Sequence, residues 1–161
     1  MNRFWRAGMA VLLSAGIAGT AAAQDCAPPD ETEALAVIAL RAHLMVAALQ
    51  CRDGNGYNTV VGRFGEGFLD AQRRVAGHFA RTSGERARTA FDRWNTTLAN
   101  EWAEQARRLG PAICTESGAL FQELAGTQPG AAFNAVAIRI AARVPAWIPL
   151  ACRAPAAPSQ P

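Results

Sequence analysis

The stretch that decides the fold is residues 33–50, EALAVIALRAHLMVAALQ. Apolar side chains occur on almost every face of a helix built from this stretch, and Arg41 and His43 interrupt them in the middle. A helix that is apolar all round is normally covered on several sides. Pro28, Pro29 and the two acidic residues after them favour a helix start just before this stretch. We therefore expect one central helix.

A second helix is expected after the turn sequence of residues 53–56, DGNG, with Asn58 as its N-cap and Arg81 near its end. Three glycines weaken its first half, because each costs about 1 kcal/mol relative to alanine in a helix interior. Two explanations stay open: the helix starts late, or the glycines allow close approach to the central helix. The three residues are Gly62, Gly65 and Gly67.

Three more helices are expected at residues 83–109, 112–124 and 131–143, since glycine, proline and polar residues interrupt the apolar patterns between them. Short loops make neighbouring helices antiparallel. The predicted fold class is all-α, a four- to five-helix antiparallel bundle. We assign residues 24–126 to this bundle and 127–161 to a C-terminal helix with a proline- and alanine-rich tail.

The first 23 residues have the three parts of an export signal. Arg3 and Arg6 form a positive start, residues 7–18 are apolar, and Ala21 and Ala23 are the small residues that a signal peptidase requires. We expect cleavage between Ala23 and Gln24. The protein is then periplasmic or secreted.

Four cysteines in an exported chain indicate two disulfides, for which three pairings exist. Antiparallel helices place Cys51 and Cys114 at the same end of the bundle. The topology therefore favours a Cys51–Cys114 bridge, which leaves Cys26 and Cys152 to form the second.

Composition argues against several functions. All 16 basic residues are arginine; removing Arg3 and Arg6 with the signal leaves 14 basic against 13 acidic residues. That near balance gives no electrostatic case for nucleic acid.

The two histidines, His43 and His78, lie too far apart along the helices to share a metal, and no known catalytic motif occurs. We expect no enzyme activity, no cofactor and no metal.

The chain also resembles a group of small exported helical proteins of bacteria. The resemblance rests on residues 40–51 and 98–101, on Tyr57-Asn58, and on Phe64 and Cys114, within residues 35–125. It implies a helical fold and an exported location. The group has no assigned activity, so the resemblance implies no functional residue.

The leading hypothesis is a protein that acts by contact with a protein partner in the cell envelope, such as an inhibitor, an immunity factor or a stress-related binder. The first alternative is a periplasmic carrier of a small apolar ligand, and the second is an exported hydrolase without a recognisable motif. A carrier would show an enclosed apolar cavity, whereas a contact protein would show an exposed apolar patch. The predicted pocket residues of the carrier are Arg41, His43, Met45, Phe64, Trp94 and Trp102.

Residues 131–150 form a cationic amphipathic segment with a tryptophan, and no acidic residue follows Glu123. Such a segment can lie on an anionic membrane surface. A bridge from Cys152 to Cys26 would instead hold the segment against the helices. We therefore expect docking on the bundle rather than contact with a membrane.

Overall fold

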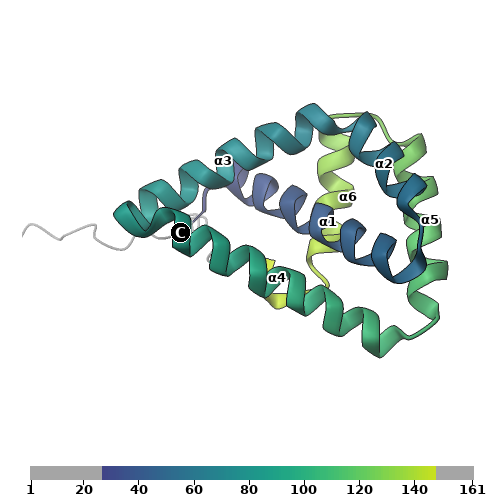
Figure 1. Ribbon diagram of the computed structural model, residues 1–161. Helices are drawn as coiled ribbons and strands as arrows, with labels where there is room; N and C mark the ends of the chain where they lie inside the picture. Colours follow the sequence, from purple (N-terminus) through teal and green to yellow (C-terminus); the bar gives the residue numbers. More distant parts are fainter. Residues whose placement is uncertain (1–26, 148–161) are drawn as a thin grey trace, which may run out of the picture.

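The computed structural model describes residues 27–147, which form helices and no β-strand (Figure 1). The prediction of an all-α protein is confirmed. The elements are α1 (Pro29–Cys51), α2 (Gly54–Arg63), α3 (Gly65–Ser83), η1 (Gly84–Arg86), α4 (Ala87–Leu109), α5 (Ala112–Gly126), α6 (Ala131–Ala141) and η2 (Pro145–Trp147), where η marks a short 3₁₀ helix.

Helix α1 is the core of the molecule and contacts each of the other five α-helices. It has Pro29 at its first turn with Asp30 and Glu31, and it ends at Arg52, which takes the left-handed conformation with a φ of 57°. By length and composition α1 could cross a membrane. However, 72% of its most apolar 18-residue stretch is buried inside the protein. Its apolar character is therefore used in packing against the other helices.

The second predicted helix is in fact two helices. α2 starts at Gly54 rather than at Asn58, because the carboxylate of Asp53 accepts a hydrogen bond of 2.9 Å from the Gly56 amide and caps the helix. The chain then bends at Phe64, whose φ of −108° and ψ of 17° are not helical. Phe64 is buried and stacks on Phe133 of α6, with ring centroids 4.2 Å apart. Burial of this ring is the packing gain that accompanies the break.

Of the two explanations offered for the glycines, the late start is correct in part, because α3, the helix that reaches residue 81, starts at Gly65, but α2 precedes it. Close approach to the central helix is not supported. A Cβ placed on Gly62 or Gly65 would meet no atom within 4 Å, and one on Gly67 would only touch the Phe133 ring at 3.8 Å. The glycines therefore do not bring two helices close together. They flank the bend at Phe64 instead.

Helices α5 and α6 run across the direction of α1, α3 and α4 (Figure 1). This arrangement departs from the predicted antiparallel bundle, in which all helices share one axis. α6 packs behind α1 in this view, where five of its side chains join the core. They are Phe133, Val136, Ala137, Ile140 and Ala141.

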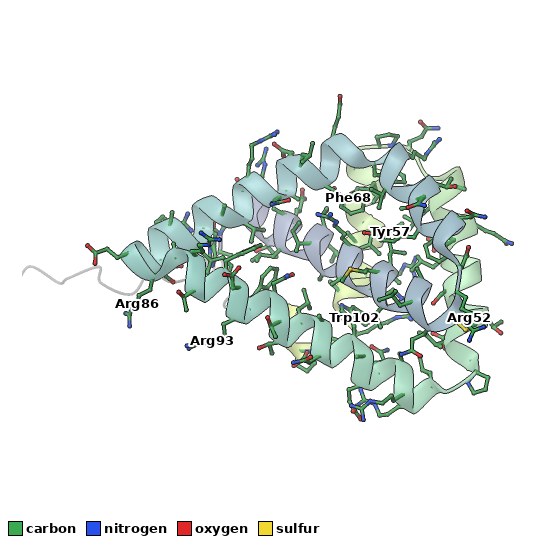
Figure 2. The ribbon with its side chains drawn as sticks, in the orientation of Figure 1. Arg52, Tyr57, Phe68, Arg86, Arg93 and Trp102 are labelled. Carbon is green, nitrogen blue, oxygen red and sulfur yellow. A yellow bond between two sulfur atoms is a disulfide. The ribbon has the colours of Figure 1, made fainter. Side chains whose placement is uncertain are left out.

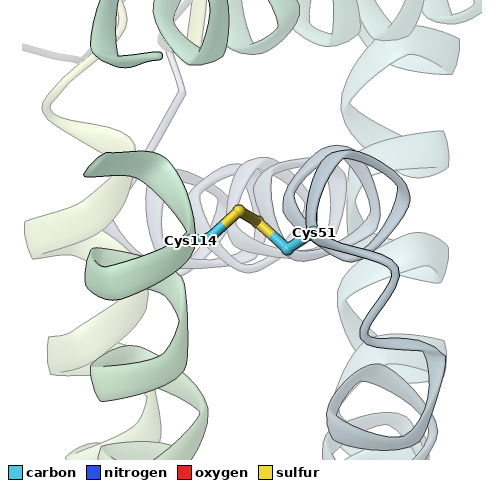
Figure 3. Close-up of a disulfide and its surroundings, with 2 residues drawn as sticks. All are labelled: Cys51 and Cys114. Atoms are coloured by element: carbon cyan, nitrogen blue, oxygen red, sulfur yellow. A yellow bond between two sulfur atoms is a disulfide. The ribbon is translucent and has the colours of Figure 1, made fainter. Parts of the chain in front are cut away.

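A disulfide joins Cys51, the last residue of α1, to Cys114 in the first turn of α5 (Figure 3). The two Cα atoms are 5.4 Å apart. This pairing confirms the one that helix order favoured. Cys26 and Cys152 lie outside the described residues, as do the expected cleavage site and residues 148–161.

Candidate functional site

An open groove follows one side of α1 between α3 and α4. Figure 2 shows this side of α1, with labels on Tyr57 of α2, Phe68 of α3 and Trp102 of α4. The groove has a volume of about 260 Å³. We call it the α1 groove and define it by its lining residues, Ile38, Arg41, Ala42, Met45, Tyr57, Gln72, Phe91, Asn95 and Ala99.

The floor of the groove is a stripe of α1 side chains at helical spacing. Ile38, Arg41, Ala42 and Met45 follow one another at intervals of three, one and three residues, which places them on one helix face. The stripe is apolar except for Arg41. The remaining charged residues of the neighbouring helices do not line the groove.

The floor continues into an exposed apolar end of α1. Met45 is 44% exposed and Leu49, one helical turn further, is 75% exposed. A single exposed aliphatic side chain is normal on a protein surface, whereas a contiguous set beside a groove is typical of an interaction site. The helix that forms the core therefore also presents apolar side chains to solvent.

Arg41 holds an unneutralised charge at this floor. Its side chain is half-buried, and its guanidinium carbon lies 5.9 Å from the centroid of the Phe68 ring, a cation–π contact. Nine ion pairs join residues within 27–147, and none of them includes Arg41. The groove consequently has one positive charge that no carboxylate of the described chain compensates.

The six residues of the predicted pocket are not brought together. Arg41 and Met45 line the α1 groove. Phe64 stacks on α6, as described above, and the indole N–H of Trp94 donates to the carbonyl of Ala146 at 2.9 Å. His43 packs against Trp102, with ring centroids 4.3 Å apart. His43 is two residues from Arg41 along the helix, so the two side chains face different directions.

His43 instead forms part of a cavity of about 340 Å³ between α1, α5 and α6. Two ion pairs line this cavity: Glu123 of α5 with Arg139 of α6, and Glu116 of α5 with Arg143, which follows α6. Burial and, to a smaller extent, the positive charge of Arg143 together lower the pKa of His43 to about 4. The imidazole is therefore neutral at pH 7.

Sequence reasoning missed a cluster that joins the start of α1 to the end of α3. The Nδ1 atom of His78 lies 2.8 Å from a carboxylate oxygen of Glu31, and Arg81 pairs with the same carboxylate. Hydrogen bonds from Arg81 and then from His78 hold the pKa of Glu31 below its usual value. The sequence did contain a pattern that could have predicted this cluster. His78 and Arg81 are three residues apart near the end of one predicted helix, and Glu31 lies in the first turn of a neighbouring helix predicted to be antiparallel to it.

The Glu31–His78 pair has the groups of a general base, but a substrate cannot reach the imidazole. His78 is 2% exposed, so its imidazole is closed to a substrate in this conformation. The cluster places the Glu31 carboxylate in the first turn of α1 and the cationic Arg81 in the last turn of α3, where helix dipoles favour both. Its role in the described chain is to fasten the two helices.

A larger cavity, about 550 Å³, lies between α1, α2, α3 and α6, and both charged and apolar residues line it. Several of its polar groups are paired with one another. Arg74 binds Asp30 and Asp70, and Asn134 donates to Glu33. Arg63 and Glu66 also line it and belong to no ion pair within residues 27–147, although Arg63 donates to the carbonyl of Thr127. This cavity therefore has charged groups of both signs, whereas Arg41 is the one charged residue that lines the α1 groove.

Residues 27–147 contain no group of three or more histidine, cysteine, aspartate or glutamate side chains that could hold a metal ion. No protein-family model, curated protein or solved structure matches this chain. The fold and the site thus define a class in structural terms only. The protein is a small all-α protein with one observed disulfide and an open apolar groove along its core helix.

Proposed function

We propose that the protein acts by contact with another protein, and that the α1 groove is where this partner binds. The observation that supports the proposal is the exposure of Met45 and Leu49 beside the groove. Apolar side chains exposed around a hollow form the kind of surface in which a partner can bury an anchor residue.

The size of the groove favours a partner protein over a carried ligand. Pockets that enclose drug-sized molecules have volumes of roughly 300–1,000 Å³. The α1 groove, at about 260 Å³, is smaller and open along one side. A cavity of about 150 Å³ already accepts a benzene ring. One inserted side chain therefore suits the groove better than a whole carried molecule.

The proposal includes export, so that the partner is a protein of the cell envelope. Its support is the signal-like pattern of residues 1–23. Mass analysis of the N-terminus of the protein isolated from its host should give a chain that begins at Gln24. A mature chain that retains Arg3 and Arg6 would contradict export by cleavage.

Affinity capture from an envelope extract tests the contact function. The mature protein is immobilised, and mass spectrometry identifies both bound proteins and bound small molecules. Leu49→Glu and Met45→Glu place a charge in the apolar end of the groove and should reduce the recovery of the partner at least tenfold. Ile138→Glu is the matched control, since Ile138 is an exposed aliphatic residue of α6, 38% accessible, and α6 lies on the other side of α1.

The control separates the proposed surface from general effects of added charge. Equal recovery with Leu49→Glu and Ile138→Glu would refute the groove as the binding surface. Recovery of a small molecule with no protein would refute the contact function and favour the carrier.

A further inference from the structure

We infer that the partner presents a carboxylate next to the apolar side chain that it inserts, and that Arg41 binds this carboxylate. The inference rests on the proposed contact function and specifies the chemistry of the partner. It follows from an unpaired positive charge on an otherwise apolar floor.

The first step of the argument is the cost of covering Arg41. Arg41 is a half-buried residue among the apolar residues of the floor, and its guanidinium has no acidic partner within residues 27–147. A partner that covers the groove removes water from this group. Burying an unpaired charge is strongly unfavourable, whereas pairing it with a carboxylate offsets the loss of hydration.

The second step is that Arg41 is held in place before any partner arrives. Its guanidinium lies against the Phe68 ring, and Ile38 and Met45 are its neighbours one turn away on the same face. A guanidinium can bind both oxygens of a carboxylate in one plane. The position of the bound carboxylate is thereby fixed relative to the apolar floor.

The third step is the arrangement of the other lining groups. Met45 on α1 and Phe91 on α4 supply an apolar surface, and the amides of Gln72 and Asn95 lie on the opposite walls as further hydrogen-bond donors. A carboxylate at Arg41 therefore has an apolar surface within reach of the group beside it. The fitting partner is a protein segment in which an acidic residue stands next to an aromatic or aliphatic one.

Charge complementarity decides against the other kinds of segment. A basic side chain at the same place would face Arg41 at close range, and a neutral segment would leave the guanidinium unpaired. A protein with an acidic and apolar segment meets both requirements of the groove.

Two probes that differ only in charge test this inference. N-acetyl-phenylalanine has an aromatic ring and a carboxylate; its amide has the same ring without the charge. Each is titrated into the ¹⁵N-labelled mature protein, and amide chemical shifts are followed. We expect shifts at residues of the α1 groove and an affinity about tenfold lower for the amide, as expected for loss of one charged hydrogen-bonded pair.

Two substitutions assign the effect to Arg41. Arg41→Gln should abolish the difference between the two probes, while Arg93→Gln should preserve it, because Arg93 is an exposed arginine of α4 outside the groove. If Arg41→Gln does not fold, the unaltered protein still gives a readout. Rising salt should weaken binding of the carboxylate probe and leave the amide nearly unchanged.

Several outcomes would overturn the inference. One is equal affinity for both probes; another is shifts that cluster away from the groove. Partner capture that is lost with Leu49→Glu but unchanged with Arg41→Gln would leave the contact function standing and remove the carboxylate. Recovery of a free small-molecule carboxylate without protein would support carboxylate binding at Arg41 but would show that the carboxylate does not come from a protein.

Discussion

At the scale of single residues, His43 shows how an apolar helix accommodates a polar group. The sequence placed His43 beside Arg41 as a pocket residue, but the structure buries it against Trp102 and leaves it 4% exposed. Its partners come from α4, α5 and α6, so no pattern within α1 could reveal them. The contact between Glu31 and His78 likewise joins two helices, and the two residues are 47 positions apart in the chain.

The pKa of His43 predicts a stability that falls in acid. In the folded protein this pKa is about 4, against an ordinary value of 6.5, so the unfolded chain takes up the proton first as the pH falls. The stability from the neutral imidazole is complete above pH 6.5 and is lost as the pH falls to about 4. The lost free energy of unfolding should be about 3 kcal/mol. The charged groups facing this ring are Arg139, Arg143, Glu116 and Glu123.

Urea unfolding between pH 7 and pH 4 measures this loss. His43→Phe keeps a ring against Trp102 but does not titrate, so its stability should fall less over the same range. The difference between the two proteins isolates the contribution of His43 from that of the carboxylates. Identical losses in both proteins would show that His43 is not buried as a neutral group.

At the scale of elements, helix ends were easier to predict than the break inside a helix. The ends at Gly84 and Gly110 follow from local signals, and both residues have a φ of 55°, which favours glycine. The bend at Phe64 has no such signal. It accompanies packing on Phe133 of α6, which lies 69 positions later in the chain (133 − 64). The low helix propensity of the glycines therefore indicated where the helix would break, but not that packing on Phe133 accompanies the break.

Two glycines of the same helix should respond to alanine in opposite ways. Gly77 lies inside α3, and a Cβ there would meet no atom within 4 Å, so Gly77→Ala should stabilise the protein by about 0.5–1 kcal/mol. Gly84 ends α3 with a positive φ, so Gly84→Ala should destabilise it by about 1 kcal/mol. Thermal unfolding compares the two. The same sign for both substitutions would contradict the helix boundary.

At the scale of the whole molecule, topology predicted one bridge and missed the crossing of helices. Cys51 and Cys114 follow from helix order alone, because each helix reverses the direction of the one before. The sequence did not predict that α5 and α6 would cross α1, nor which side of α1 would stay open. Both depend on the fit of side chains from distant helices. The α1 groove could not be predicted for this reason, although two of its residues were.

Opening the bridge should weaken the entire fold. The Cys51–Cys114 disulfide links residues 63 positions apart, and closing a loop of this length stabilises a protein by about 4 kcal/mol in the chain-entropy model. The double substitution of Cys51→Ser and Cys114→Ser should lower the free energy of unfolding by about that amount, measured in urea without reductant. Replacing both cysteines avoids an unpaired thiol. A loss below about 1 kcal/mol would indicate that the reduced, unfolded chain is already compact.

The contact between α1 and α6 has a consequence for the way the protein is made. α1 ends at Cys51 and α6 begins at Ala131, so a ribosome adds about 80 residues between them, which takes roughly 4–16 s at 5–20 residues per second. During that interval the long apolar helix α1 lacks the surface that covers one of its sides. The core can therefore close fully only after α6 has been synthesised. A chaperone that holds apolar segments has its clearest binding site in the nascent chain at residues 33–50.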